Sequence, residues 1–264
     1  MVLLLTGAID IREFDVPSTT IVSIDERLSQ YLYSIDYAIA NYKTISEIVF
    51  CENTDYKHDY SNLKEKALIN NKKLEIISFK GDYAKIQQKG KGFGEGEIIE
   101  HALNKSELLQ RSDVFFKLTG RLIVKNMDKV VAATQSDNSF IYHPKTIYKI
   151  PKDHIETFFF KVNKNLYIKH LINACQFVEE SRFQYLEHIF YERLSALDLH
   201  SFKITPLISG FSGTSGEPYE SGTKATILEK INCFIGVHNL KKTIIQRITT
   251  QMLSCLIKMS RSLK

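Results

Sequence analysis

The chain has 264 residues, of which 44% are hydrophobic, 25% charged and 11% aromatic, with 12 glycines and 5 prolines. This composition supplies one large core or two small ones, and it excludes collagen-like, coiled-coil and low-complexity disordered chains. The formal net charge of +5 comes from 35 Lys and Arg against 30 Asp and Glu. Seven of those basic residues follow Glu229, where no acidic residue occurs, leaving 28 basic and 30 acidic residues before that point. The excess positive charge therefore belongs to the tail, which argues against a generally basic nucleic-acid-binding protein.

Cysteine usage and apolar runs indicate the compartment. The four cysteines are far apart and form no CxxC pair, which predicts reduced, buried thiols and neither disulfides nor a zinc site. The first residues, MVLLLTG, lack the basic region and the apolar length of a signal peptide and predict a buried strand. No apolar run reaches the roughly 20 residues that span a bilayer. We therefore expect a cytoplasmic protein.

Strand-like and helix-like segments alternate along the first half of the chain. The pattern predicts strands at 2–5, 47–50, 74–79 and 114–118. It predicts helices at 25–41, 61–70 and 97–109, and Ser23 or Asp25 can cap the first. This alternation predicts a parallel sheet with helices on its faces. Ligands of such sheets bind beyond the carboxyl ends of the strands, so the segments that follow the strands should carry the chemistry.

The pattern changes from residue 129 onward. Short aromatic and β-branched segments predict antiparallel or edge strands at KVVAAT (129–134), SFIYH (139–143) and TFFFKV (157–162). Further along, the sequence predicts a helix at 179–197, a mobile Gly/Ser loop at 209–222 and helices over 223–264.

A glycine-rich stretch, KGKGFGEGE (89–97), follows the third predicted strand. Glycines such as Gly92 and Gly94 let backbone amides approach a ligand, and a helix start offers unpaired N–H groups. The stretch is neither GxGxxG nor a P-loop, and Glu95 and Glu97 would repel a phosphate. These carboxylates therefore either accept hydrogen bonds from ligand hydroxyls or cap the helix, and a simple flexible turn is the alternative.

The fourth predicted strand runs into FFKLTGR (115–121). Strand alternation places Lys117 and Thr119 on one face, and Gly120 permits a sharp exit. Lys117 and Arg121 at this sheet edge would supply two cations for a diphosphate, and surface ion pairs are the alternative. A lysine within an otherwise apolar strand is costly to bury without a partner, which favours the binding role.

The block GKGFGEGE followed by DVFFKLTGR resembles small bacterial glycosyltransferases of capsule and lipopolysaccharide biosynthesis, which carry a G-x-G-E-G-E…F-x-K-x-T-G-R pattern. The strict match covers 90–121, and looser similarity extends to ETFFF (156–160), YLEHIFYERL (185–194) and the SGFSGTSG loop. The resemblance implies a GT-A-like (Rossmann-type) α/β fold, with a mostly parallel sheet flanked by helices and a C-terminal helical segment.

The resemblance also implies where the donor binds. The nucleoside would lie after the first strand and at the acidic end of the second, and the usual metal-binding DxD is replaced by KLTGR (117–121). Side-chain cations would then neutralise the leaving diphosphate in place of Mg²⁺ or Mn²⁺, so we expect no metal and metal-independent transfer. Ser136-Asp137-Asn138, the nearest DxD alternative, is interpreted as a turn. The expected nucleotide-sugar-binding residues are Thr6, Gly7, Glu52, Asn53, Gly92, Gly94, Glu95, Lys117, Thr119, Gly120 and Arg121.

An inverting transferase needs a carboxylate that accepts the proton of the acceptor hydroxyl. Glu187 is the first choice, followed by Glu180 and Glu156, and a solvated helix face is the alternative for Glu187. Lys117 and Arg121 complete the predicted catalytic set, and Glu156 and His188 are assigned to the acceptor. The histidines show no HxxxH, HExxH or Cys/His clustering, so no metal ligands are predicted.

The tail at 241–264 places apolar residues on one helical stripe flanked by basic residues. We expect this helix to rest on an anionic inner leaflet, and a packed terminal helix or a homodimer contact is the alternative. The predicted domain organisation is a GT-A-like domain at 1–205, with a donor half (1–125) and an acceptor half (126–205), followed by 206–264.

Together these features predict transfer of a sugar from a nucleotide sugar, with a UDP-sugar favoured and no further cofactor. The acceptor would be a lipid-linked or lipid A-core glycan (lipopolysaccharide, O-antigen or capsule) at the cytoplasmic face of the inner membrane, with no nucleic-acid partner. A nucleotidyltransferase acting on sugar phosphates and a non-catalytic nucleotide- or glycan-binding module are the alternatives.

Overall fold

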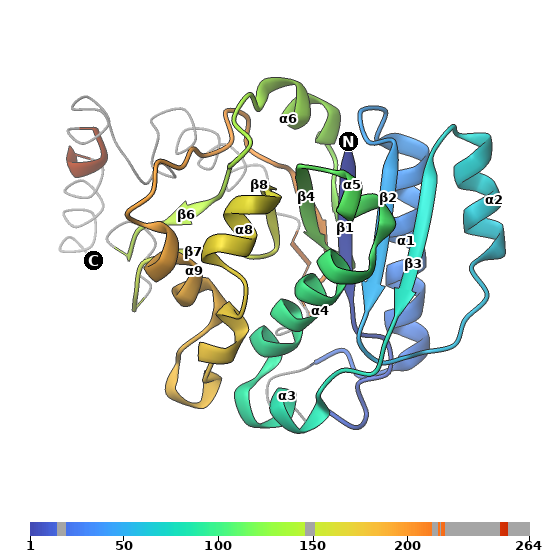
Figure 1. The fold of residues 1–264 in the computed structure, drawn as a ribbon, viewed down its shortest axis with the longest axis horizontal. Coiled ribbons are helices and arrows are strands. Elements are labelled where there is room, and N and C mark those ends of the chain that lie inside the picture. The colour runs from blue at the N-terminus through green and yellow to red at the C-terminus, as the bar shows by residue number, and fades with distance from the viewer. Residues whose placement is uncertain (15–19, 146–150, 213–215, 217, 220–248, 253–264) are drawn as a thin grey trace, which may run out of the picture.

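A five-stranded sheet in the order β3-β2-β1-β4-β8 forms the centre of the molecule in the computed structural model (Figure 1). The structure describes residues 1–14, 20–145, 151–212, 216, 218–219 and 249–252. β1 to β4 pair in parallel, and β8 is antiparallel to β4. The strands are β1 (Val2–Gly7), β2 (Glu47–Glu52), β3 (Lys73–Ser78), β4 (Val114–Thr119) and β8 (Phe159–Asn163). The predicted α/β class, with a mostly parallel sheet flanked by helices, is confirmed.

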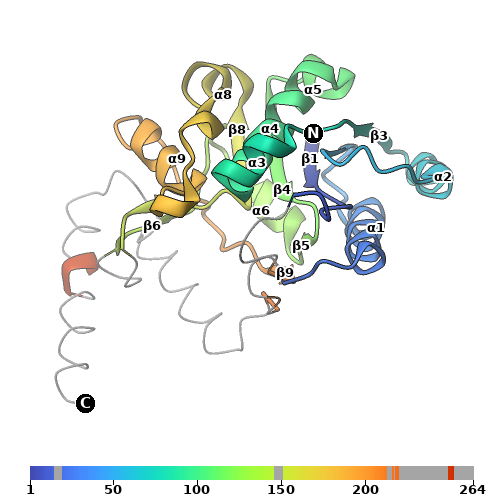
Figure 2. The same ribbon diagram turned by 90° about the horizontal axis from the view of Figure 1, so that it is seen from below.

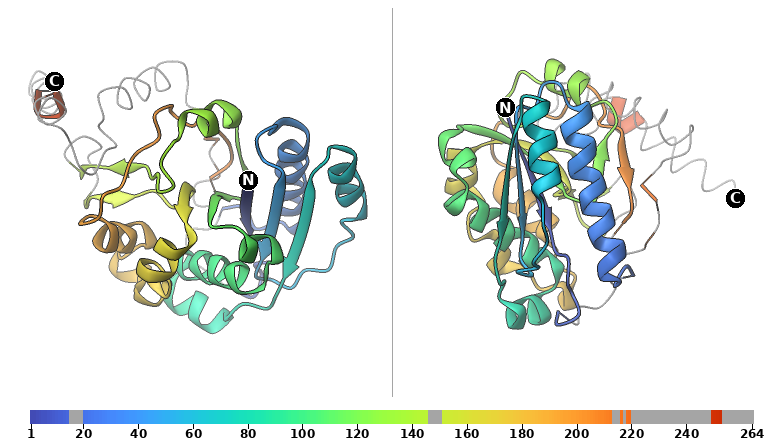
Figure 3. Two further views of the ribbon diagram at one scale, coloured as in Figure 1. Left: turned by 45° about the horizontal axis from the view of Figure 1, so that its top comes forward. Right: turned by 90° about the vertical axis from the view of Figure 1, so that its right-hand side faces the viewer.

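Helices cover both faces of this sheet (Figure 2). One face carries α1 (Ile24–Asn41) and α2 (Ser61–Ile69), which lie together in front of the strands in the right-hand view of Figure 3. The other face carries α3 (Tyr83–Lys89), α4 (Lys91–Lys105), α5 (Glu107–Arg111), α8 (Lys164–His170) and α9 (Leu186–Leu194). The sheet is therefore covered by hydrophobic side chains on both sides, as parallel sheets require.

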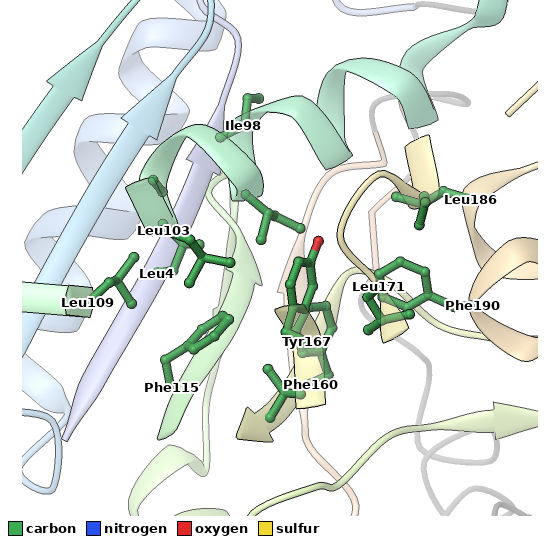
Figure 4. Packing of buried hydrophobic residues seen from close by; sticks show 14 of the residues in the cluster. Leu4, Ile98, Leu103, Leu109, Phe115, Phe160, Tyr167, Leu171, Leu186 and Phe190 are labelled. Carbon is green, nitrogen blue, oxygen red and sulfur yellow. The ribbon is translucent and has the colours of Figure 1, made fainter. Parts of the chain in front are cut away.

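Alternation along β1 divides the core in two. Leu3 and Leu5 pack with the α1 side chains Tyr31 and Ile35, whereas Leu4 packs with residues of α4, α8 and α9. Figure 4 shows the second cluster, with Ile98 and Leu103 of α4 above Leu4 and the aromatic rings of Phe160, Tyr167 and Phe190 beyond. All of VLLLTG is buried, because neighbouring side chains of a strand point to opposite faces and both faces are covered.

The four strands and the first two helices predicted for the first half are found, with small shifts at their ends. The single helix predicted at 97–109 is instead two helices, α4 and α5, separated at Ser106, and α3 was not predicted. α1 begins after Ser23, whose side chain accepts a hydrogen bond from the Glu26 N–H. β2 extends two residues beyond its predicted end, to Glu52. The Glu52 carboxylate is fully buried and accepts hydrogen bonds from the N–H groups of Thr54 and Tyr56.

The glycine-rich stretch is helical from Lys91 onward, whereas the sequence predicted a helix only from residue 97. α4 already begins at Lys91, and Gly90, with φ of 106°, joins it to α3. The reason is tertiary packing, because a Cβ on Gly96 would lie 2.5 Å from the Cβ of Cys175 and one on Gly92 would lie 3.1 Å from Leu186. The glycines let the first turns of α4 approach the neighbouring chain.

Two predictions for the second half are wrong. KVVAAT lies mostly in the helix α6 (Met127–Ala133), where Met127 and Val130 are buried and Lys129 is exposed. The helix predicted at 179–197 is only α9, because a 3₁₀ turn (η2, Glu180–Arg182) and a left-handed Phe183 precede it. The remaining elements are β5 (Leu122–Val124), β6 (Tyr142–His143), β7 (His154–Ile155), η1 (Ala174–Phe177) and β9 (Ile208–Gly210).

The predicted basic helix at 241–264 lies outside the described residues except for 249–252, which are helical. The rest of 223–264 and most of the predicted Gly/Ser loop beyond 212 also lie outside them. Among the described residues, the helices are too short or too polar to cross a membrane. Cys51 and Cys175 are buried free thiols, as predicted, and Cys233 and Cys255 lie outside the described residues.

Candidate functional site

A cavity of about 780 Å³ opens at the carboxyl ends of β1 and β4, where the topology places ligand sites. Its wall is built from the segment after β1, the end of β2, the first turns of α4, the end of β4, the segment before β8 and the start of α9. The predicted residues that line it are Thr6, Gly7, Asn53, Gly92, Gly94, Glu95, Thr119, Arg121, Glu156, Glu180 and Glu187. The predicted residues that are not in its wall are Glu52, Lys117, Gly120 and His188.

Glu52 shapes the loop that carries Asn53. Its carboxylate accepts the backbone N–H groups of Thr54 at 2.8 Å and Tyr56 at 3.0 Å, together with the hydroxyls of Thr54 and Ser78. Because all of these bonds hold the chain after β2 in place, Glu52 supports the cavity wall from beneath and does not face a ligand, contrary to the prediction.

Lys117 is the partner of Glu95. Its side chain is fully buried, forms an ion pair with Glu95, and donates to Thr119 Oγ1 at 3.0 Å and to the Thr157 carbonyl at 2.7 Å. Glu95 also accepts the Thr6 hydroxyl at 2.9 Å. The lysine therefore neutralises a carboxylate of the glycine-rich stretch, which corrects the expectation that it faces the diphosphate.

Gly120 brings the end of β4 against β1. Its N–H donates to the Thr6 carbonyl at 2.8 Å, and a Cβ at Gly120 would lie 2.6 Å from that oxygen. The residue is needed for this close approach, which turns the chain so that Arg121 enters the cavity wall.

Arg121 has N–H donors that its contacts with the described residues do not use. Its Nη1 donates to Gln30 Oε1 at 3.4 Å, and its Nε is buried with no hydrogen-bond partner among the described residues. A guanidinium offers five N–H donors in a planar fork, which suits the oxygens of a phosphate.

Two further cations, Arg27 and Lys91, line the same cavity as Arg121 and were not predicted from the sequence. Burial lowers the pKa of Arg27, and the charge of Arg121 adds to this effect. Burial also lowers the pKa of Lys91, with Arg121 and Arg27 contributing in the same direction and Glu180 opposing them. Lys91 belongs to the glycine-rich stretch, which was a usable signal, whereas Arg27 lies in a helix without a motif.

Two carboxylates, Glu156 and Glu187, lie in the same wall. Glu187 accepts the Thr157 hydroxyl at 2.7 Å. Burial raises its pKa and the charge of Glu156 adds to the rise, while the Thr157 hydrogen bond opposes both. Tyr219 stands beside this pair, and burial together with the two negative charges raises its pKa to about 12, with Arg121 acting in the opposite direction.

Glu156 is held by two histidines that the sequence analysis left unassigned. Its Oε1 lies 2.8 Å from His143 Nδ1 and 3.1 Å from His154 Nε2. Burial alone would raise its pKa, but these two hydrogen bonds and the imidazole charges hold it at about 2. The histidines follow no metal-binding sequence motif, yet the pairing of β6 with β7 places His143 and His154 beside Glu156, which sequence spacing alone did not indicate.

His188 belongs to the start of α9. Its Nδ1 accepts the Tyr185 N–H at 3.3 Å, and burial lowers its pKa. Glu180, another candidate base, accepts the Gly92 N–H at 2.8 Å and fixes the first turn of α4. In the structure, His188 therefore supports the helix that presents Glu187, and it is not in the cavity wall.

No protein-family model and no curated protein matches this chain. Among solved structures, it is similar to an active-site mutant of LgtC, at 12% identity and a TM-score of 0.43, over 72% of this chain and 69% of that one. It is also similar to the glycosyltransferase GlyE of Streptococcus pneumoniae, at 11% identity and a TM-score of 0.43, over 76% of this chain but only 44% of GlyE. A nucleoside-diphosphate-sugar pyrophosphorylase of Vibrio cholerae matches at 14% identity and a TM-score of 0.37, over 73% of this chain and 86% of that one.

Proposed function

We propose that this protein is a glycosyltransferase that moves a sugar from a nucleotide sugar to a hydroxyl of a surface glycan. The observation that carries the proposal is Arg121, a cavity-wall cation whose buried Nε–H has no partner in the described part of the chain. It shares the cavity with the carboxylates Glu156 and Glu187. A leaving diphosphate needs such a cation, and an attacking hydroxyl needs such a carboxylate.

The donor is assigned to the sheet edge. Thr6, Gly7 and Asn53 border the place for the nucleoside, with a uridine favoured, and Arg121 with Lys91 faces the diphosphate. We propose that these side chains neutralise the diphosphate without a metal ion. Nucleoside-diphosphate affinity should then stay the same in EDTA, and a tenfold or greater gain with Mn²⁺, measured by titration calorimetry, would contradict this part of the proposal.

Glu187 is the proposed base for an inverting displacement. It takes the proton of the acceptor O–H while that oxygen bonds to the anomeric carbon. The bond from this carbon to the diphosphate breaks, and the diphosphate leaves with the electron pair. A raised pKa suits a carboxylate that must accept a proton near neutral pH. Glu156 is assigned to positioning the acceptor.

The proposed acceptor is a lipid-linked or lipid A-core glycan, as in lipopolysaccharide, O-antigen or capsule synthesis. The seven basic residues after Glu229 support this proposal, because a cationic tail suits an enzyme on the anionic cytoplasmic face of a membrane. Flotation of the full chain with anionic liposomes, and its loss after deletion of 241–264, is the expected result. Flotation that survives the deletion would contradict it, and a change from dimer to monomer would assign the tail to a homodimer contact instead.

A thermal-shift screen against UDP, GDP, CMP and dTDP identifies the base, since a ligand at 100 times its dissociation constant stabilises a protein by about 2.7 kcal/mol. Slow hydrolysis of the matching nucleotide sugar then tests the reaction, with Arg121→Ala as the inactive variant and Arg111→Ala, outside the cavity wall, as the control. Release of pyrophosphate from a nucleoside triphosphate and a sugar phosphate would show a nucleotidyltransferase. Glycan binding without turnover of any donor would show a binding module.

A further inference from the structure

The strand pair β6–β7 gathers three metal-ligating side chains. His143 and His154 are direct partners in its register. Glu156 lies two residues beyond His154, and its N–H donates to the Ile141 carbonyl at 2.9 Å, which continues the pairing past the end of β7. Directly paired residues, and residues two apart, present their side chains on the same face of a strand pair. Local backbone geometry thus places one imidazole nitrogen from each histidine and a carboxylate oxygen within 4.8 Å of one another.

From this arrangement we propose a binding site for a divalent transition metal ion of the Zn²⁺ class, held by His143, His154 and Glu156. Imidazole nitrogens suit Zn²⁺, Co²⁺ and their neighbours, whereas Mg²⁺ prefers oxygen ligands. Zinc bonds of about 2.0–2.2 Å set tetrahedral ligand atoms roughly 3.3 Å apart. The observed separations from Glu156 Oε1 are 2.8 Å to His143 Nδ1 and 3.1 Å to His154 Nε2, close to this spacing, and all three ligand atoms lie within 4.8 Å of one another.

Neighbouring residues hold the three ligand side chains in place and leave them partly exposed to solvent. Asp153 Oδ1 accepts the Tyr142 hydroxyl at 2.9 Å and the Lys145 N–H at 3.0 Å, which fixes the strand pair beside the ligands. The Tyr142 ring stacks on Tyr191 of α9 at 5.5 Å between centroids. Each ligand side chain is 16–17% exposed, which is enough for an ion to enter.

The proposed ion would border the cavity. Glu156 belongs to the cavity wall, whereas the two histidines do not. Three protein ligands leave a fourth position for water or a ligand oxygen, and this combination of two histidines and one glutamate is a known zinc-binding set. The site is separate from the proposed neutralisation of the diphosphate, which involves Arg121 and Lys91.

The test uses the full chain without an affinity tag, stripped with a chelator and titrated first with Co²⁺ and then with Zn²⁺. We expect binding of a single equivalent, the visible absorption of four-coordinate Co²⁺, its loss when Zn²⁺ displaces the Co²⁺, and a higher melting temperature with Zn²⁺ but not with Mg²⁺. A stripped wild-type chain that binds neither ion would overturn the proposal and leave a carboxylate hydrogen-bonded to two imidazoles. This first measurement needs no variant, donor or acceptor, so it stands whether or not the proposed transferase activity is found.

Variants then assign the ligands. His143→Ala and His154→Asn should each weaken Zn²⁺ binding at least about tenfold, since even the outer-shell partners of metal ligands are worth that much. The matched control is His58→Ala, because His58 is an exposed histidine outside the cluster and its loss should change nothing. Circular dichroism confirms that the variants are folded. Unchanged affinity in both cluster variants, or an equal loss in the control, would place the ion elsewhere and refute the assignment.

Discussion

The two sides of the cavity are built in different ways. On the sheet side, Lys117, Glu95 and Thr6 are joined by an ion pair and hydrogen bonds across β1, β4 and α4. On the other side, Glu156 and Glu187 come from the segment after a two-residue strand and from the first turn of a short helix. The sheet side is therefore fixed by the central scaffold, whereas the carboxylate side depends on short elements packed around it.

This comparison separates structural from functional charges. Lys117 is the most conspicuous cation in the sequence, but its charge is used within the fold. Arg121, only four residues later, keeps donors available in the cavity wall. A prominent position in a motif therefore does not by itself identify the residue that binds the ligand. The following substitutions test which charged residues serve the fold and which bind a ligand.

The largest effect is expected for Glu187→Gln. Removing the proposed base should lower sugar transfer by about 10²–10⁴-fold, because that is the usual contribution of a general base. Donor binding should remain, since Gln keeps the size of the side chain and can still accept the Thr157 hydrogen bond. Steady-state rates and donor titration measure the two properties. A variant that turns over normally would remove Glu187 from the mechanism.

Lys117→Met should lower the stability of the fold more than it lowers nucleotide binding. Leaving Glu95 without its buried partner should lower the free energy of unfolding by about 3–5 kcal/mol, which urea denaturation measures. The double variant Lys117→Met/Glu95→Gln should recover most of this loss, because no unpaired charge remains. If the single variant is as stable as wild type but fails to bind nucleotide, Lys117 contacts the diphosphate after all.

Arg121→Ala should show the opposite behaviour. Losing charge-assisted hydrogen bonds worth about 1.5–3 kcal/mol should weaken nucleoside-diphosphate binding by roughly 10–150-fold. Stability should change little, since its one described hydrogen bond is long, at 3.4 Å. The control is Arg111→Ala, an exposed arginine that pairs with Glu107 and is not in the cavity wall, and it should bind normally. Equal nucleotide affinity in the two variants would contradict the donor assignment.

The smallest effects are expected from substitutions of the α4 glycines, of which Gly96→Ala should cost more stability than Gly94→Ala. At Gly96 the new methyl group would lie 2.5 Å from the Cβ of Cys175, and such overpacking costs about 1–3 kcal/mol. At Gly94 the nearest contact would be 3.2 Å, to the Asn53 side chain, so Gly94→Ala should destabilise less. Thermal melts of the two variants measure the difference, and a reversed order would show that close packing at Cys175 is not the reason for a glycine there.

The sequence by itself determined the parallel half of the fold. Runs such as VLLLT and EIVF contain enough apolar and β-branched residues to form strands in any covered sheet, and the helical period of 25–41 is set by local spacing. The position of Arg121 at the end of a parallel strand also indicated the cavity, whereas Thr6 and Asn53 were implied by the resemblance and Glu95 by the glycine-rich stretch.

Only the tertiary structure decided the partners of the charged groups. The sequence around Lys117 does not predict that Glu95 neutralises it, and the sequence around His143 does not predict its pairing with His154. Both contacts depend on how separate segments of the chain pack together. The glycine-rich stretch became helix for the same reason, because its preference for a loop was overridden by packing against Cys175 and Leu186. Local spacing sets secondary structure, whereas the use of each charge depends on what the fold places beside it.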